Sequence, residues 1–306
     1  MKSLKTIVKE SIFDDVDDIV SNDPLMHKTV EQFLTDNYDI DGTYVINKDN
    51  TVDVNGSVYV KQRNISNPLI SLVNKLFRFG NVSGSFDCRF QAKLASLKGA
   101  PEKVSGDFSC NGCDGLTSLE GAPKEVGGGF DCNDCYNLKS LEGAPKIVGK
   151  SFYCSFCSKL ESLKGAPEKV GNHFVCTDCE KLKSLEGAPE KIKWNFICNE
   201  CTNLVNLKGA PKEVNGDFDC SDCSGLKSLN GAPKKVGGDF VCSGCPKLKS
   251  LEGAPKEVGE DFCCSRCPSL ISLEDAPEKV GGIFRCSYCS NLTITDADNV
   301  KYNLRK

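Results

Sequence analysis

Residues 214–233 read Val-Asn-Gly-Asp-Phe-Asp-Cys-Ser-Asp-Cys-Ser-Gly-Leu-Lys-Ser-Leu-Asn-Gly-Ala-Pro, and close variants of this stretch recur through most of the 306-residue chain. A phenylalanine followed two positions later by a cysteine returns every 22 residues from Phe86 to Phe284, without a slip in register. A fixed period between about 20 and 50 residues is typical of a solenoid, in which each repeat forms one coil stacked on the next. The sequence therefore predicts a β-rich repeat solenoid.

The residue types within one repeat indicate how a coil is built. Phe218 and Cys220 alternate with polar neighbours, which predicts a short strand with both side chains pointing inward. Cys223, Leu226 and Leu229 follow at a spacing of three, which suits a chain that turns around the same core. The segment 231–233, Gly-Ala-Pro, then predicts a bend, because proline lacks a backbone donor.

The segment Phe-x-Cys-x-x-Cys-x-x-Leu resembles the strand-and-turn half of a leucine-rich repeat, with phenylalanine and cysteine in place of the leucines and cysteine in place of the asparagine. The spacing departs from that family in two places: Val214 to Phe218 is one residue longer than its opening, and two residues separate Cys223 from Leu226. The resemblance covers residues 82–292 and implies about ten to eleven coils that share one parallel sheet.

Arrays rich in cysteine and in Ser-Leu-Glu-Gly-Ala-Pro segments also resemble repeat proteins predicted in tailed phages and gut bacteria. The opening residues 1–11, Met-Lys-Ser-Leu-Lys-Thr-Ile-Val-Lys-Glu-Ser, resemble the N-termini of phage proteins. This resemblance implies a bacterial or phage-infected host cell, or a virion, as the setting of the protein.

The repeat divides the chain into four predicted parts. A helical N-terminal cap covers residues 1–40, a degenerate β capping coil with a linker covers 41–81, the solenoid covers 82–292, and a C-terminal cap covers 293–306. The end coils of a solenoid have unpaired edges that need such covers.

Three local patterns describe these caps. Pro24 favours the first turn of a helix that runs to about Asp36. Residues 54–60 have the shape of the strand segment, with valines where later coils use phenylalanine and cysteine. Val300 and Leu304 are expected to close the last coil.

Composition limits the compartment and the class of ligand. The net charge is −4, so no strong field attracts nucleic acid or anionic lipid. The first twenty residues lack the apolar core of a secretory signal, and the longest apolar run, near residues 68–73, is too short to span a membrane. These features favour a cytoplasmic protein with free thiols.

The twenty cysteines allow two interpretations. Nineteen lie in two periodic columns, and the other is Cys263. Pairs such as Cys110-x-x-Cys113 in neighbouring coils match the spacing of a four-thiolate zinc site, which predicts a metal-binding cysteine solenoid. However, the 22-residue period produces this spacing by itself, and the first coil has Gln91 in place of the second cysteine. We therefore favour buried apolar cysteines, and expect no metal and no cofactor.

A binding surface is predicted on the middle coils. The residue between each phenylalanine and its cysteine should point outward, and this column is mostly polar at the ends but more apolar in the middle. Trp194, the only tryptophan, stands where most coils have glycine. The predicted patch consists of Tyr153, Phe156, His173, Val175, Trp194 and Ile197. Exposed apolar clusters with aromatic anchors mark interaction sites, whereas the alternative is drift among residues that favour strands.

Several carboxylates are expected on the same face: Asp107, Asp217, Asp239 and Asp261. They argue against a nucleic-acid ligand and suit a basic protein partner, or they serve solubility alone. No catalytic residues are predicted, because neither His27 nor His173 has an evident nucleophile partner. The sequence favours a non-enzymatic protein-binding scaffold. The alternatives are the metal-binding solenoid and a phage virion or assembly component that is docked by its N-terminal helices.

Overall fold

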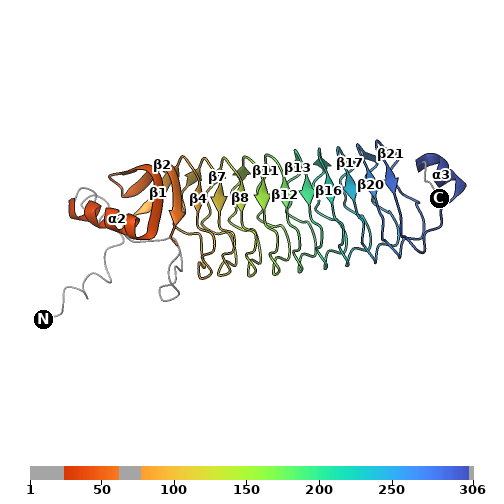
Figure 1. Ribbon diagram of the computed structural model, residues 1–306, viewed down its shortest axis with the longest axis horizontal. Helices are drawn as coiled ribbons and strands as arrows, with labels where there is room; N and C mark the ends of the chain where they lie inside the picture. Colours follow the sequence, from red (N-terminus) through yellow and green to blue (C-terminus); the bar gives the residue numbers. More distant parts are fainter. Residues whose placement is uncertain (1–23, 62–76, 303–306) are drawn as a thin grey trace.

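The computed structural model describes residues 24–61 and 77–302 as an elongated stack of coils with a short helix at each end (Figure 1). Helix α2 (Pro24–Asn37) lies at one end and helix α3 (Asp296–Tyr302) at the other. The predicted repeat solenoid with parallel strand pairing is confirmed.

Each coil contributes two strands of two residues, where the sequence predicted one. The strands that contain the repeat phenylalanine are β4 (Phe86–Asp87), β6 (Phe108–Ser109), β8 (Phe130–Asp131), β10 (Phe152–Tyr153), β12 (Phe174–Val175), β14 (Phe196–Ile197), β16 (Phe218–Asp219), β18 (Phe240–Val241), β20 (Phe262–Cys263) and β22 (Phe284–Arg285). The additional strands, just before them, are β5 (Lys103–Val104), β7 (Glu125–Val126), β9 (Ile147–Val148), β11 (Lys169–Val170), β13 (Lys191–Ile192), β15 (Glu213–Val214), β17 (Lys235–Val236), β19 (Glu257–Val258) and β21 (Lys279–Val280).

The core runs along the inside of the stack. Phenylalanines of neighbouring coils pair in exact register, as Phe152 does with Phe130 and Phe174. Their rings stack with centroid distances between 5.0 and 5.6 Å from Phe86 to Phe284. The two cysteine columns and the two leucine columns complete the interior, and from Leu94 to Leu270 their side chains are fully buried. The inward assignment made from the sequence is therefore confirmed.

The N-terminal end of the stack is closed by a β-hairpin. Strand β1 (Tyr38–Ile46) pairs antiparallel with β2 (Thr51–Val60), and β2 pairs in parallel with β3 (Arg78–Val82) and β4. Val58 pairs with Phe86, so β2 supplies a valine-based coil. Residues 38–40 belong to β1 rather than to the helical cap, because Tyr38 continues the hairpin register opposite Val60. The helix expected before residue 24 lies outside the described residues.

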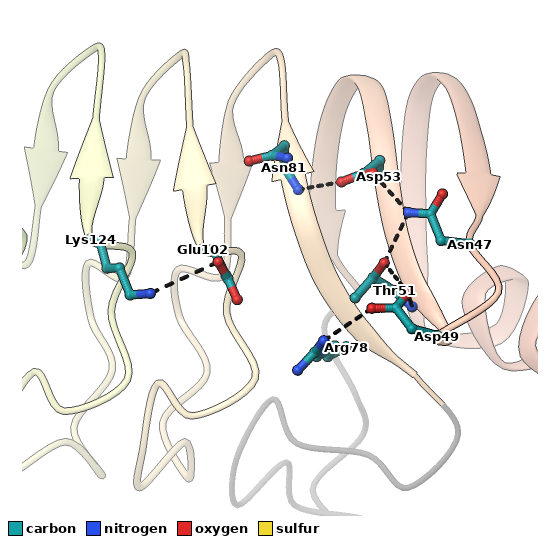
Figure 2. A network of polar contacts seen from close by, with 8 residues as sticks. All are labelled: Asn47, Asp49, Thr51, Asp53, Arg78, Asn81, Glu102 and Lys124. Carbon is teal, nitrogen blue, oxygen red and sulfur yellow. Dashed lines mark hydrogen bonds and ion pairs between the residues drawn. The ribbon is translucent and has the colours of Figure 1, made fainter. Parts of the chain in front are cut away.

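Polar side chains attach this hairpin to the first coils (Figure 2). Asn47 donates to the Asp53 carboxylate (2.8 Å), which also accepts the backbone amide of Asn81 (2.6 Å). Asp49 pairs with Arg78 at 3.1 Å. The bonds of Asp53 to Asn81 and of Asp49 to Arg78 join the hairpin to β3, about thirty residues away in the sequence, and so hold the cap in register with the stack.

The C-terminal end is covered by α3. The ring of Tyr302 stacks on Phe284 with a centroid distance of 4.2 Å, and its hydroxyl donates to the Pro277 carbonyl at 2.8 Å. Tyr302 thus continues the phenylalanine column beyond the last coil. The packing expected of the Val300 side chain and of Leu304 lies outside the described residues.

Candidate binding surface on the strand face

The outward residues beside the repeat phenylalanines form a long surface, which we call the strand face. Its backbone is held by a column of polar side chains that stand one position before most of the phenylalanines. The Asp217 carboxylate accepts the backbone amide of Asp239 at 2.9 Å, and Asp239 in turn accepts that of Asp261 at 2.8 Å. Asn195 makes the same bond to Asp217 at 3.1 Å. These carboxylates, which the sequence assigned to a basic partner or to solubility, also connect successive coils, a role that the sequence analysis missed.

His173 belongs to the same polar column. Its Nδ1 accepts the backbone amide of Asn195 at 3.4 Å, and its own backbone amide donates to Ser151 Oγ, also at 3.4 Å. The ring of His173 contacts that of Trp194 at a centroid distance of 6.0 Å and an interplanar angle of 50°. His173 thus contacts the coil before it and the coil after it. Its ring and the ring of Trp194 form an aromatic pair on the strand face.

Five residues of the predicted patch adjoin one another. Tyr153, Val175 and Ile197 are direct neighbours in the parallel ladder. His173 precedes Val175 by two positions in an extended segment, so both point to the same side. Trp194 joins them through its contact with His173 and is 51% exposed. We call Tyr153, His173, Val175, Trp194 and Ile197 the strand-face patch.

Phe156 stands apart from this group. It lies beyond Cys154, at the opposite end of the strand from His173, and is 44% exposed. Its φ of +59° places it in the left-handed region, as do the residues at the same position of other coils, for example Asp134 and Asp178. Aspartate, asparagine and glycine tolerate this conformation best, which is why most coils have a small or polar residue here.

The coil that contains Trp194 is not hydrogen-bonded like its neighbours. One coil earlier, the amides of Gly171 and Asn172 donate to the carbonyls of Val148 and Lys150, each at 2.9 Å. Among the described residues, the amides of Lys193 and Trp194 donate to no carbonyl of the preceding coil. Strands β11 and β13 are therefore not paired with each other, and β13 begins a separate five-stranded sheet. We call this interval between β11 and β13 the seam.

The seam coincides with the loss of two glycines from one coil. A Cβ atom placed on Gly149 or Gly171 would overlap the carbonyl oxygen of the coil before it, and Lys193 has a Cβ at the equivalent position. A single side chain is tolerated, because the amides of Asn172 and Asn215 still donate to the preceding coil, and each asparagine stands beside a glycine. Only at Lys193 and Trp194 do both positions carry a side chain. We therefore attribute the seam to the two side chains acting together.

The second cysteine column, Cys113 to Cys289, has a specific structural role. All nine of its thiols donate to the backbone carbonyl of the first-column cysteine in the coil before, at 3.1 to 3.4 Å. In the first coil, the amide of Gln91 donates to the Val60 carbonyl at 3.4 Å instead. A side-chain donor at this position satisfies a backbone carbonyl of the strand before it. This explains why glutamine can replace cysteine at Gln91.

Burial also affects the chemistry of these thiols. It raises the pKa of Cys220, and it raises the pKa of Cys245 to about 12. The thiolate is the reactive form of cysteine, so these buried thiols are poor nucleophiles near neutral pH. Among the described residues, no three histidine, cysteine or acidic side chains are grouped as a metal site, and no helix is long and apolar enough to cross a membrane.

Comparison with known proteins gives one structural likeness. No protein-family model matches the chain, and no curated protein matches it. A leucine-rich repeat protein from Bacteroides ovatus ATCC 8483 is similar in structure, with a TM-score of 0.49 and 16% sequence identity. The match covers 83% of this chain and 81% of that one. The strand register and the buried columns establish by themselves that this chain is a parallel β-solenoid.

Proposed function

We propose that this protein is a non-enzymatic scaffold that binds a protein partner through the strand-face patch. The observation that carries the proposal is the position of Trp194. A half-exposed tryptophan stands in the described coil that lacks the two backbone bonds which the amides at the positions of Lys193 and Trp194 make in the other described coils. Each such bond contributes about 0.5–1.5 kcal/mol. A residue that breaks the local structural pattern without adding stability elsewhere is typical of a functional position.

The surroundings of Trp194 suit a binding role. Val175 and Ile197 provide an apolar floor on rigid strands, and Tyr153 adds a second aromatic ring on the same ladder. Tryptophan and tyrosine are enriched among the residues that dominate binding energy at protein interfaces. A preformed surface also loses little conformational entropy when a partner binds.

The free thiols support a reducing compartment such as a bacterial cytoplasm, since all twenty cysteines are unpaired. The setting in a bacterial or phage-infected cell rests on the sequence resemblance alone.

The test is affinity capture from a bacterial lysate with the wild type beside the double variant Trp194→Ala/Ile197→Asp. Aspartate already occupies the position of Ile197 in β16, so the variant should fold. Val241→Asp is the matched control, because it introduces the same charge on the same ladder two coils away. A partner that binds the wild type and the control but not the double variant supports the proposal. A partner retained by all three proteins places the contact elsewhere.

The alternative function is a structural role in which the N-terminal helices dock the protein. Its test is a truncation that leaves helix α2 and the β1–β2 hairpin intact. Val30 and Leu34 of α2 are buried, and β1 completes the hairpin. Removal of residues 1–23 is therefore the appropriate variant. Loss of the partner on this truncation, with retention in Trp194→Ala/Ile197→Asp, would favour the docking role over the strand-face patch.

A further inference from the structure

Three carboxylates follow the strand-face patch along the stack without a cationic neighbour. Asp217 and Asp219 lie one coil beyond Ile197, and Asp239 lies two coils beyond it. Among the described residues, none of the three forms an ion pair. By contrast, Asp222 pairs with Arg266, and Asp261 with Arg285.

The backbone holds these carboxylates in fixed positions. One oxygen of Asp219 accepts the backbone amide of Ser221 at 2.9 Å, and one oxygen of Asp239 accepts that of Asp261 at 2.8 Å. Among the described groups, the second oxygen of each accepts no hydrogen bond. Asp217 uses its second oxygen to accept the Asn195 side-chain amide at 2.9 Å. Asp219 and Asp239 therefore each present one rigid, unoccupied acceptor.

Charged side chains on the strands that precede the phenylalanines form ion pairs between coils. On the strands that precede the phenylalanines, lysine and glutamate pair from coil to coil, as in Lys191 with Glu213 at 2.9 Å and Lys235 with Glu257 at 3.3 Å. The unpaired carboxylates of the strand face thus contribute to the surplus negative charge of the chain. A fixed negative region beside an exposed aromatic surface is complementary to a segment that carries an apolar side chain and cations.

We propose that the occupant of this face is a basic, amphipathic peptide segment of the protein partner. An apolar side chain of the segment packs on Trp194 and Ile197, and its lysine or arginine side chains bind Asp219 and Asp239. Successive strands lie about 4.8 Å apart, so the apolar contact and the two charge contacts fall within about 10 Å along the stack. This inference rests on the proposed function and adds the chemistry of the partner.

The variants that test it preserve the fold. Asparagine at 195 accepts a backbone amide in the same way as the neighbouring aspartates, so Asp239→Asn retains the inter-coil bond and removes only the charge. Asp219→Asn likewise retains an acceptor for Ser221. The matched control is Asp107→Asn, since Asp107 is a ladder aspartate that bonds Gly129, four coils before Asn195.

The experiment selects binders from a random twelve-residue peptide library displayed on yeast, with the full-length protein as the target. The dissociation constants of the selected peptides are then measured for the variants at low and high salt. We expect selected peptides with an apolar residue near lysine or arginine. We expect binding about tenfold weaker to Asp219→Asn/Asp239→Asn, with a reduced salt dependence, and unchanged binding to Asp107→Asn.

The outcomes separate the two proposals. Peptides that lose binding in Trp194→Ala but bind Asp219→Asn/Asp239→Asn as tightly as the wild type would overturn the inferred basic partner and leave the patch as the binding site. Peptides that bind Trp194→Ala unchanged, or a library that yields no binder, would count against both the partner chemistry and the patch.

Discussion

The thiol of Cys201 donates a hydrogen bond to the backbone carbonyl of Cys176, with a sulfur–oxygen distance of 3.2 Å, and both side chains are fully buried. The equivalent contact recurs along the second cysteine column. The two columns therefore differ in function although they contain the same residue type. Among the described residues, only Cys88 and Cys132 of the first column donate to a carbonyl, whereas every thiol of the second column satisfies a carbonyl of the coil before it.

This difference predicts unequal effects of two otherwise similar substitutions. Cys198→Ala and Cys201→Ala each remove one buried thiol, but only the second deprives the Cys176 carbonyl of its donor. We expect Cys201→Ala to lose about 1 kcal/mol more in the free energy of unfolding, since an unsatisfied buried acceptor is costly. Urea denaturation of both variants measures the difference, and equal losses would mean that the thiol bond contributes nothing.

The phenylalanine column should dominate the stability of the coils. Phe196→Ala removes a fully buried ring that stacks on Phe174 and Phe218, and we expect it to cost about 3–5 kcal/mol. Phe156→Ala deletes the same atoms from an exposed position and should cost about 0.5 kcal/mol or less. Equilibrium denaturation distinguishes the two. A loss below about 1 kcal/mol for Phe196→Ala would contradict its place in the core.

The seam should be visible in hydrogen exchange. The amides of Lys193 and Trp194 have no acceptor in the preceding coil, whereas those of Asn215 and Gly216 donate to Ile192 and Trp194. We expect the first pair to exchange faster than the second, because unbonded amides are poorly protected. Residue-resolved exchange on the native protein measures this.

The double variant Lys193→Gly/Trp194→Gly provides the complementary test. Without the two side chains, the coil can approach Gly171 as other coils approach their neighbours. Slower exchange at residues 193 and 194 in this variant would establish the steric origin of the seam. Unchanged fast exchange would assign the seam to some other cause.

Thiol reactivity should be confined to a few positions. Seventeen of the twenty cysteines are buried, and only Cys263, Cys286 and Cys289 are half-buried. The contact with the Cys267 side chain lowers the pKa of Cys289 to about 7, whereas burial raises the pKa of Cys286. The thiolate is the reactive form, so Cys289 should react first with a disulfide reagent, at a rate that rises as the pH passes about 7.

Titration of the native protein should therefore detect about three thiols, against twenty after denaturation. Cys289→Ser should abolish the fast phase near neutral pH. Reaction of many more thiols in the native state would contradict the buried columns. Elemental analysis of the same sample addresses the metal-binding alternative directly.

Much of this architecture could be predicted from the sequence. The 22-residue period places Phe196, Cys198 and Leu204 at equivalent points of a coil, and their apolar character directs them inward. Burial of apolar surface is a property of residue type and spacing, both of which the sequence displays. The outward position of Trp194 followed from the same register, because it stands in a column where most other coils have glycine.

Only the tertiary structure decided how neighbouring coils are joined. The sequence assigned Asp217 to a basic partner or to solubility, yet it also accepts the amide of Asp239, 22 residues away. Phe156 looked like part of the patch, but the turn after Cys154 carries it to the other end of the strand. The seam lies at the coil where Lys193 and Trp194 both replace glycine, and whether two adjacent side chains fit against the preceding coil depends on the distances between the coils. Periodicity determines which residues face the core, whereas hydrogen bonds and close approaches between coils depend on atomic distances that exist only once the coils are stacked.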